Sequence, residues 1–196
     1  MIASVSPELP PRSITLIRHG PPTVSLTTQI RGRDFRQFVE RYEAARIHRQ
    51  ATPPESVKRV MHRATRVFAS DRPRALHTAE LLGAPQQPIV DSRFREIEFP
   101  VDFPLYVRLP ALVWTALALF IWRLGYSPRC ESSVAAQSRA RTVARLLVQE
   151  ANRTGPIVLV AHGGINRLIA KELRRSGWQG PRLPHSRHWG CTTYSL

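Results

Sequence analysis

The chain has 196 residues, which suits one domain with a sizeable hydrophobic core. Its 29 basic and 14 acidic residues give a net charge of +15, and Lys58 and Lys171 are its only lysines. One explanation of this excess of arginine is capture of phosphate or carboxylate groups. The other is a composition biased toward arginine, with the side chains on solvated faces. The two cysteines, Cys130 and Cys191, have no CxxC spacing and argue against a disulfide scaffold or a zinc ribbon.

The predicted elements alternate between strands and helices. Short β-branched runs predict strands, and apolar residues at helical spacing predict helices. In chain order, the pattern predicts a strand at 13–17, helices at 35–47 and 55–64, a strand at 67–69, a helix between Asp71 and Gly83, a strand at 88–90, a helix at 131–152, a strand at 157–161, a helix at 165–173 and an edge strand at 191–196. Asp71 is placed to cap its helix, with Pro73 in the first turn. The alternation indicates a three-layer α/β/α fold with a mainly parallel central sheet.

Residues 1–11 lack the basic segment and apolar core of a secretory signal. We therefore expect a short, loose lead-in, a cytoplasmic protein, and one domain over residues 1–196.

An apolar insertion at about 99–130 interrupts the alternation. Within the insertion, the 14 residues Leu109–Trp122 carry no charge. This run is too short to span a membrane, which needs about 20 apolar residues. We predict a helical cap beside the active site, with Pro110 opening the main helix and Leu124-Gly125 closing it. Trp114 and Trp122 share one face of this helix, which either packs as core or lines the pocket. Alternatively, the cap contacts an anionic membrane surface or an acyl chain through its apolar face and flanking arginines.

Two strands end in a histidine followed by glycine. Arg18-His19-Gly20 follows the run 14–17, and His162-Gly163-Gly164 follows the run 157–161. Ligands collect at the carboxyl ends of strands in open α/β sheets, so we expect both histidines over one pocket.

Further blocks follow in a recognisable order. Ser70 is followed by Arg74-Ala75 and Thr78-Ala79, then by Phe94-Arg95-Glu96-Ile97, by Cys130-Glu131-Ser132, and by the block that begins at Ala161. In this order, the blocks resemble those of the histidine phosphatase superfamily, also called the phosphoglycerate mutase-like family.

The resemblance implies roles for six residues. His19 is the nucleophile that forms a phosphohistidine, and Glu96 is the general acid and base, with Glu98 as its competitor. His162 steadies the phosphoryl group in the transition state. Arg18 and Arg74 clamp the phosphate, together with the backbone N–H of Gly163, whereas Arg72 is expected to be a solvated residue at a helix start.

The chain departs from the family pattern at three places that usually shape the substrate pocket. Ser25 stands where the family has an Asn, and the usual Asp-x-Pro-Leu-Thr stretch is not evident around Arg31 to Phe35. After Glu96, Glu98-Phe99-Pro100-Val101 replaces Gly-x-Trp-Glu-Gly. The family's substrates therefore do not transfer to this chain.

The function expected is a metal-independent, cofactor-independent phosphomonoester phosphatase. Its partner is a phosphorylated small molecule, with no specific nucleic acid, and its oligomeric state stays open. The alternatives are a phosphoglycerate mutase-like phosphotransferase and, from another class, a catalytically idle, arginine-rich protein that binds anions or nucleic acid.

Overall fold

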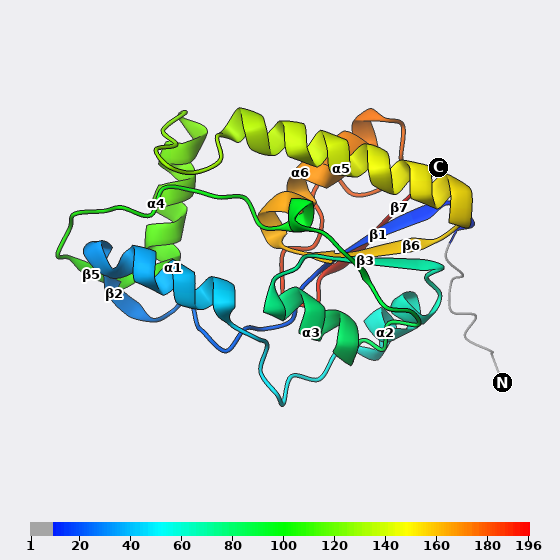
Figure 1. Cartoon of the computed structure of the whole chain (residues 1–196), viewed down its shortest axis with the longest axis horizontal. Helices are drawn as coiled ribbons and strands as arrows, with labels where there is room; N and C mark the ends of the chain where they lie inside the picture. The colour runs from blue at the N-terminus through cyan, green and yellow to red at the C-terminus, as the bar shows by residue number, and fades with distance from the viewer. Residues whose placement is uncertain (1–9) are drawn as a thin grey trace.

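A five-stranded sheet forms the centre of the computed structural model, which describes residues 10–196 (Figure 1). The expected lead-in at 1–11 falls mostly on residues 1–9, which lie outside this range. The strand order is β4-β3-β6-β1-β7. Strands β4 (Ile89–Val90), β3 (Arg66–Ala69), β6 (Ile157–Ala161) and β1 (Ser13–Arg18) are parallel, and β7 (Cys191–Ser195) is antiparallel to β1.

Helices cover both faces of this sheet (Figure 1). On one face, α5 (Ser133–Thr154) and α6 (Gly163–Arg175) pack their buried residues against strand residues such as Leu16 and Leu159. On the other face, α2 (Glu55–His62) and α3 (Pro73–Leu81) pack against strand residues such as Ile17 and Val160. Neighbouring residues of one strand thus enter opposite layers, as the pleat of a strand requires. The predicted three-layer α/β/α fold is confirmed.

A third apolar cluster lies beyond one end of the sheet. It joins α1 (Phe35–Ala44) to α4 (Ala111–Arg123), next to the short ribbon of β2 (Gln29–Arg31) and β5 (Arg108–Pro110). Phe35, Phe38, Phe103 and Trp114 fill its centre. The remaining short elements are the 3-10 turns Gly32–Asp34 and Ser92–Phe94.

Helix α4 begins after Pro110, and Gly125 follows its end with a positive φ of 96°. The expected bounds of the main helix of the insertion therefore agree with the structure. Its tryptophan face is buried core, because Trp114 packs in the third cluster and its indole N–H donates to the carbonyl of Ile30 at 3.2 Å. Among residues 10–196, no helix is long and apolar enough to cross a bilayer.

Two details of the predicted elements were wrong. The first helix ends at Ala44 and not at 47, because the backbone of Arg46 and His48 bonds instead to Thr23 and Pro21. Asp71 does not cap α3; its carboxylate pairs with Arg95, and Arg72 occupies the cap position without a side-chain bond.

Candidate active site

The two predicted histidines meet at the carboxyl ends of neighbouring parallel strands. The register pairs Arg18 at the end of β1 with Ala161 at the end of β6. His19 N–H then donates to the Ala161 carbonyl at 3.0 Å, and the rings of His19 and His162 lie with their centroids 5.2 Å apart. Residues 143 positions apart in the chain are thereby brought together by strand pairing alone.

His19 is held as a neutral imidazole with one nitrogen available. Its Nδ1 donates to the carbonyl of Gly20 at 2.8 Å, which leaves the lone pair on Nε2. Arg74 Nε donates to this Nε2 at 3.3 Å. Burial, followed by the charge of Arg74, holds the pKa of His19 well below its ordinary value of 6.5. A buried nitrogen lone pair that already faces a guanidinium is suited to attack an anionic phosphorus centre.

His162 is fully buried and is oriented by a serine. Its Nε2 lies 2.9 Å from Ser70 Oγ, and its Nδ1 has no protein partner among residues 10–196. Burial, with a further contribution from Arg74, lowers the pKa of His162 well below 6.5. The free Nδ1 is a polar atom that a bound oxyanion would satisfy.

The predicted phosphate clamps lie beside this pair. Arg74 is buried, and its NH1 group donates to the carbonyls of Tyr42 and Glu43, each at 3.2 Å. Arg18 donates to the carbonyl of Ser186, while its Nε has no partner within residues 10–196. A Cβ placed on Gly163 would lie 3.6 Å from that Nε, so Arg18 lies beside the start of α6.

Glu96 binds the first turn of α6. Its carboxylate accepts from the N–H groups of Gly164 at 3.0 Å and Ile165 at 2.8 Å, and from its own neighbour Ile97 at 3.0 Å. A carboxylate at a helix N-terminus is stabilised by these donors. The N–H of Gly163 has no protein acceptor within the described residues, so it is the donor left for an anion. The competitor Glu98 is exposed and accepts from the Glu131 N–H at 2.9 Å.

These side chains open into one pocket of about 350 Å³. Arg18, His19, Arg74, Glu96 and Glu98 line it, and His162, next to His19, is not among its lining residues. The cap contributes the opposite side through Phe99, Val101, Thr115 and Arg129, next to residues of α1. Ser25, which replaces the Asn of the family pattern, bonds to Thr27 and Thr28 and lies outside this pocket.

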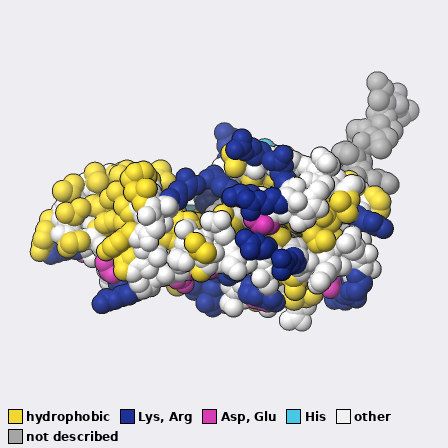
Figure 2. Space-filling model, turned by 90° about the horizontal axis from the view of Figure 1, so that it is seen from above, with side chains coloured by type: hydrophobic (Ala, Val, Ile, Leu, Met, Phe, Trp, Pro, Cys, Tyr) yellow, Lys and Arg dark blue, Asp and Glu magenta, His cyan; other side chains and the backbone are white. Residues whose placement is uncertain are grey.

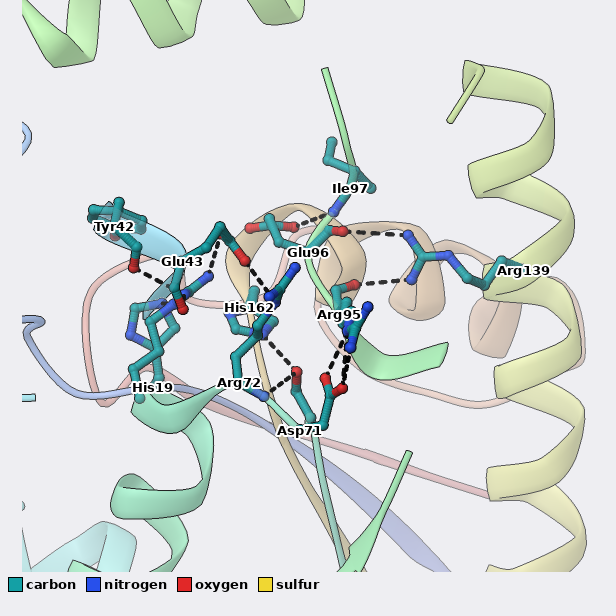
Figure 3. Close-up of polar contacts among 12 residues, drawn as sticks. His19, Tyr42, Glu43, Asp71, Arg72, Arg95, Glu96, Ile97, Arg139 and His162 are labelled. Carbon is teal, nitrogen blue, oxygen red and sulfur yellow. Dashed lines mark hydrogen bonds and ion pairs between the residues drawn. The ribbon is translucent and has the colours of Figure 1, made fainter. Parts of the chain in front are cut away.

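Sequence reasoning missed the acidic partner of the arginines. Glu43, at the end of α1, contacts Arg74 at 2.8 Å and Arg72 at 2.7 Å. Figure 3 shows Glu43 and Arg72 side by side. The expectation that Arg72 is a solvated residue was wrong, because Glu43 draws its side chain to the pocket wall. No spacing in the sequence could reveal this pair, since Glu43 precedes Arg74 by 31 residues on another helix.

Two further residues support the site. His188, in the loop before β7, has its ring centroid 5.5 Å from that of His19, and burial followed by Arg18 lowers its pKa to about 4. Arg139 on α5 forms a pair with Glu131 and donates to the carbonyls of Arg93 and Arg95 at 2.8 and 2.9 Å, so it fixes the backbone that leads into Glu96. Figure 3 shows Arg139 against the backbone of Arg95 and Glu96. Glu131 belongs to a block that the sequence singled out, and His188 gave no signal.

No metal-binding group appears in the described part of the chain: residues 10–196 hold no cluster of three or more His, Cys, Asp or Glu side chains that could bind an ion.

The fold and this edge of the sheet define an α/β protein that presents a histidine pair to an anion-binding pocket. The model of the histidine phosphatase superfamily (branch 1) matches residues 14–194, and the chain belongs to this superfamily. The structure of mycobacterial hydrolase 1 is similar, with a TM-score of 0.63 and 22% identity over 94% of this chain and 89% of the other. A mycobacterial glucosyl-3-phosphoglycerate phosphatase in complex with VO3 has a TM-score of 0.61 and 21% identity over 93% and 92%. The comparison with curated proteins found no match.

Proposed function

We propose that the chain is a phosphomonoester phosphatase that works through a phosphohistidine at His19. The observation that carries the proposal is the state of this side chain. Its Nδ1–H is tied to the Gly20 carbonyl, and its Nε2 lone pair faces the Nε of Arg74. A neutral histidine with one fixed tautomer is a competent nucleophile near neutral pH.

In the first step, Nε2 of His19 attacks phosphorus and the bond from phosphorus to the leaving oxygen breaks. Glu96, as the general acid, gives a proton to that oxygen. Arg18, Arg74, the Gly163 N–H and the free Nδ1 of His162 stabilise charge on the equatorial oxygens. In the second step, water attacks phosphorus, the N–P bond breaks, Glu96 takes the proton and inorganic phosphate leaves.

An apolar part of the pocket wall supports a substrate with apolar surface next to its phosphate. Leu26, Phe38, Val39, Phe99 and Val101 line the pocket on the side of α1 and the cap. This wall differs from the tryptophan face of α4, which is core. A series of alkyl phosphate monoesters tests the substrate class: KM falls as the chain lengthens, and Val101→Asp removes the trend while leaving KM for methyl phosphate unchanged.

Replacement of the nucleophile tests the function itself. His19→Ala abolishes turnover of p-nitrophenyl phosphate, whereas His185→Ala, a change to an exposed histidine outside the pocket wall, keeps it. Circular dichroism checks that both variants are folded. Near-normal turnover by folded His19→Ala would overturn the proposal.

A further inference from the structure

Helix α4 is apolar on its outer face, which does not pack against the rest of the protein. Its inner face is buried through Ala111, Trp114, Ala118 and Trp122. Its outer face carries apolar side chains too, and Leu112 and Phe120 expose 56% and 60% of their surface. A helix that is hydrophobic all round normally lies in buried surroundings. The outer face of α4 is therefore exposed although its apolar side chains are of the kind that is normally buried.

The segment before β5 enlarges this surface. Leu105, Tyr106 and Val107 are all exposed, and they precede α4 by only a few residues. Figure 2 shows hydrophobic side chains gathered over the end of the molecule that holds the cap. We call the exposed side chains of 105–107 and of the outer face of α4 the cap patch. Exposed apolar side chains gathered in this way mark an interaction site.

Positive charge flanks the cap patch. The chain has no acidic residue between Asp102 and Glu131, and this stretch contains Arg108, Arg123 and Arg129. Arg108 and Arg123 are exposed at the two ends of α4. A fourth arginine, Arg33, lies over the ring of Tyr106 at 4.7 Å from its centroid and pairs with Asp34 at 3.7 Å.

We propose that the cap patch docks on the surface of an anionic lipid bilayer. Helix α4 would lie in the plane of the interface, with Leu112, Leu117 and Phe120 among the upper acyl chains and Arg108 and Arg123 among the headgroups. With 13 residues the helix is too short to span a bilayer, but an in-plane helix has no such length requirement.

The charge pattern favours a bilayer over a second copy of the chain. An antiparallel pair of α4 helices would bring Arg108 of one copy to Arg123 of the other, and α4 supplies no carboxylate to neutralise them. Anionic headgroups neutralise both arginines at once. Thr115 of the same helix lines the catalytic pocket, so docking holds the pocket about one helix diameter, roughly 10 Å, from the lipid.

Flotation with unilamellar vesicles tests the proposal. The full chain binds vesicles of phosphatidylglycerol and phosphatidylcholine in equal parts and does not bind phosphatidylcholine alone. Leu112→Gln with Phe120→Gln weakens binding at least about tenfold, because both side chains lose their place among acyl chains. The matched control, Val134→Gln with Leu183→Gln, removes side chains that are exposed by 75% and 59% elsewhere and leaves binding unchanged.

A second pair of double variants distinguishes the charge beside the cap patch from the overall charge of the chain. Arg108→Gln with Arg123→Gln weakens binding by about fivefold for each arginine. Arg145→Gln with Arg167→Gln lowers the net charge equally at exposed sites on α5 and α6 and has a smaller effect. Equal losses in the two pairs would assign the attraction to the overall charge and overturn the proposal.

The remaining outcomes are equally decisive. Absence of binding to the anionic vesicles overturns the proposal, as does a dimer in sedimentation velocity that the Leu112→Gln and Phe120→Gln changes dissociate. Turnover of p-nitrophenyl phosphate in solution stays unchanged in all four variants, because none of these residues lines the pocket. Failure of docking is therefore distinct from failure of the proposed activity.

Discussion

Removal of the Trp114 side chain distinguishes a structural cap helix from one that binds substrate. Trp114 is 1% exposed and packs on Phe103 with ring centroids 5.4 Å apart. Its indole N–H donates to the carbonyl of Ile30, on the β2 strand of the ribbon. Trp114→Ala therefore empties the centre of the third cluster and leaves a buried carbonyl without its donor.

The expected cost follows from these contacts. Replacing a buried Trp by Ala costs about 3–5 kcal/mol of unfolding free energy, and this range includes the lost contacts around the cavity. For a domain of this size each kcal/mol lowers Tm by about 2–4 °C, so we expect a decrease of roughly 6–20 °C. Phe120→Ala on the exposed face of the same helix changes stability by only about 0.5 kcal/mol.

Calorimetry on both variants measures the shift, and the KM values for p-nitrophenyl phosphate and a long-chain alkyl phosphate are compared well below Tm. The account predicts a large loss of Tm for Trp114→Ala with the ratio of the two KM values unchanged. An unchanged Tm together with a selective rise in KM for the alkyl ester would refute it, since Trp114 would then line the pocket.

The remaining predictions concern the site. Glu96→Gln lowers kcat by about 10²–10⁴, most strongly for poor leaving groups, whereas Glu98→Gln changes kcat less than tenfold; the reverse order in steady-state kinetics would exchange their roles. Burial lowers the pKa of both His19 and His162, so below pH 6.5 the unfolded chain binds protons that the folded chain excludes. The unfolding free energy therefore falls as the pH drops below 6.5, by up to about 1.4 kcal/mol per pH unit for each histidine. Urea titrations measure this slope, and an equally steep slope in His19→Gln would contradict it. Turnover survives EDTA, and a loss that magnesium or zinc restores would point to another mechanism.

The meeting of the two histidines at one edge of the sheet could be predicted because it depends on local sequence and strand pairing. A β-branched run followed by His-Gly specifies both the strand and the residue at its end, and parallel pairing of two such runs brings His19 to His162. The bounds of α4 were equally local, since Pro110 and Gly125 limit where a helix can run.

Partners from distant elements could not be predicted. Glu43 reaches Arg72 and Arg74 only because the third cluster orients α1 toward the pocket. Asp71 has the spacing of a helix cap, yet its carboxylate pairs with Arg95, which lies 24 residues further along the chain. The eight-residue spacing of Trp114 and Trp122 placed them on one face, but only tertiary packing shows that this face is core.

Trapping the covalent intermediate tests the central claim most directly. The protein is mixed with p-nitrophenyl phosphate and quenched in alkali, and its peptides are analysed by mass spectrometry. The account predicts a phosphoryl group on Nε2 of His19 in the native chain and none in His19→Ala. A phosphoryl group on His162, or steady turnover without any phosphorylated peptide, would contradict it.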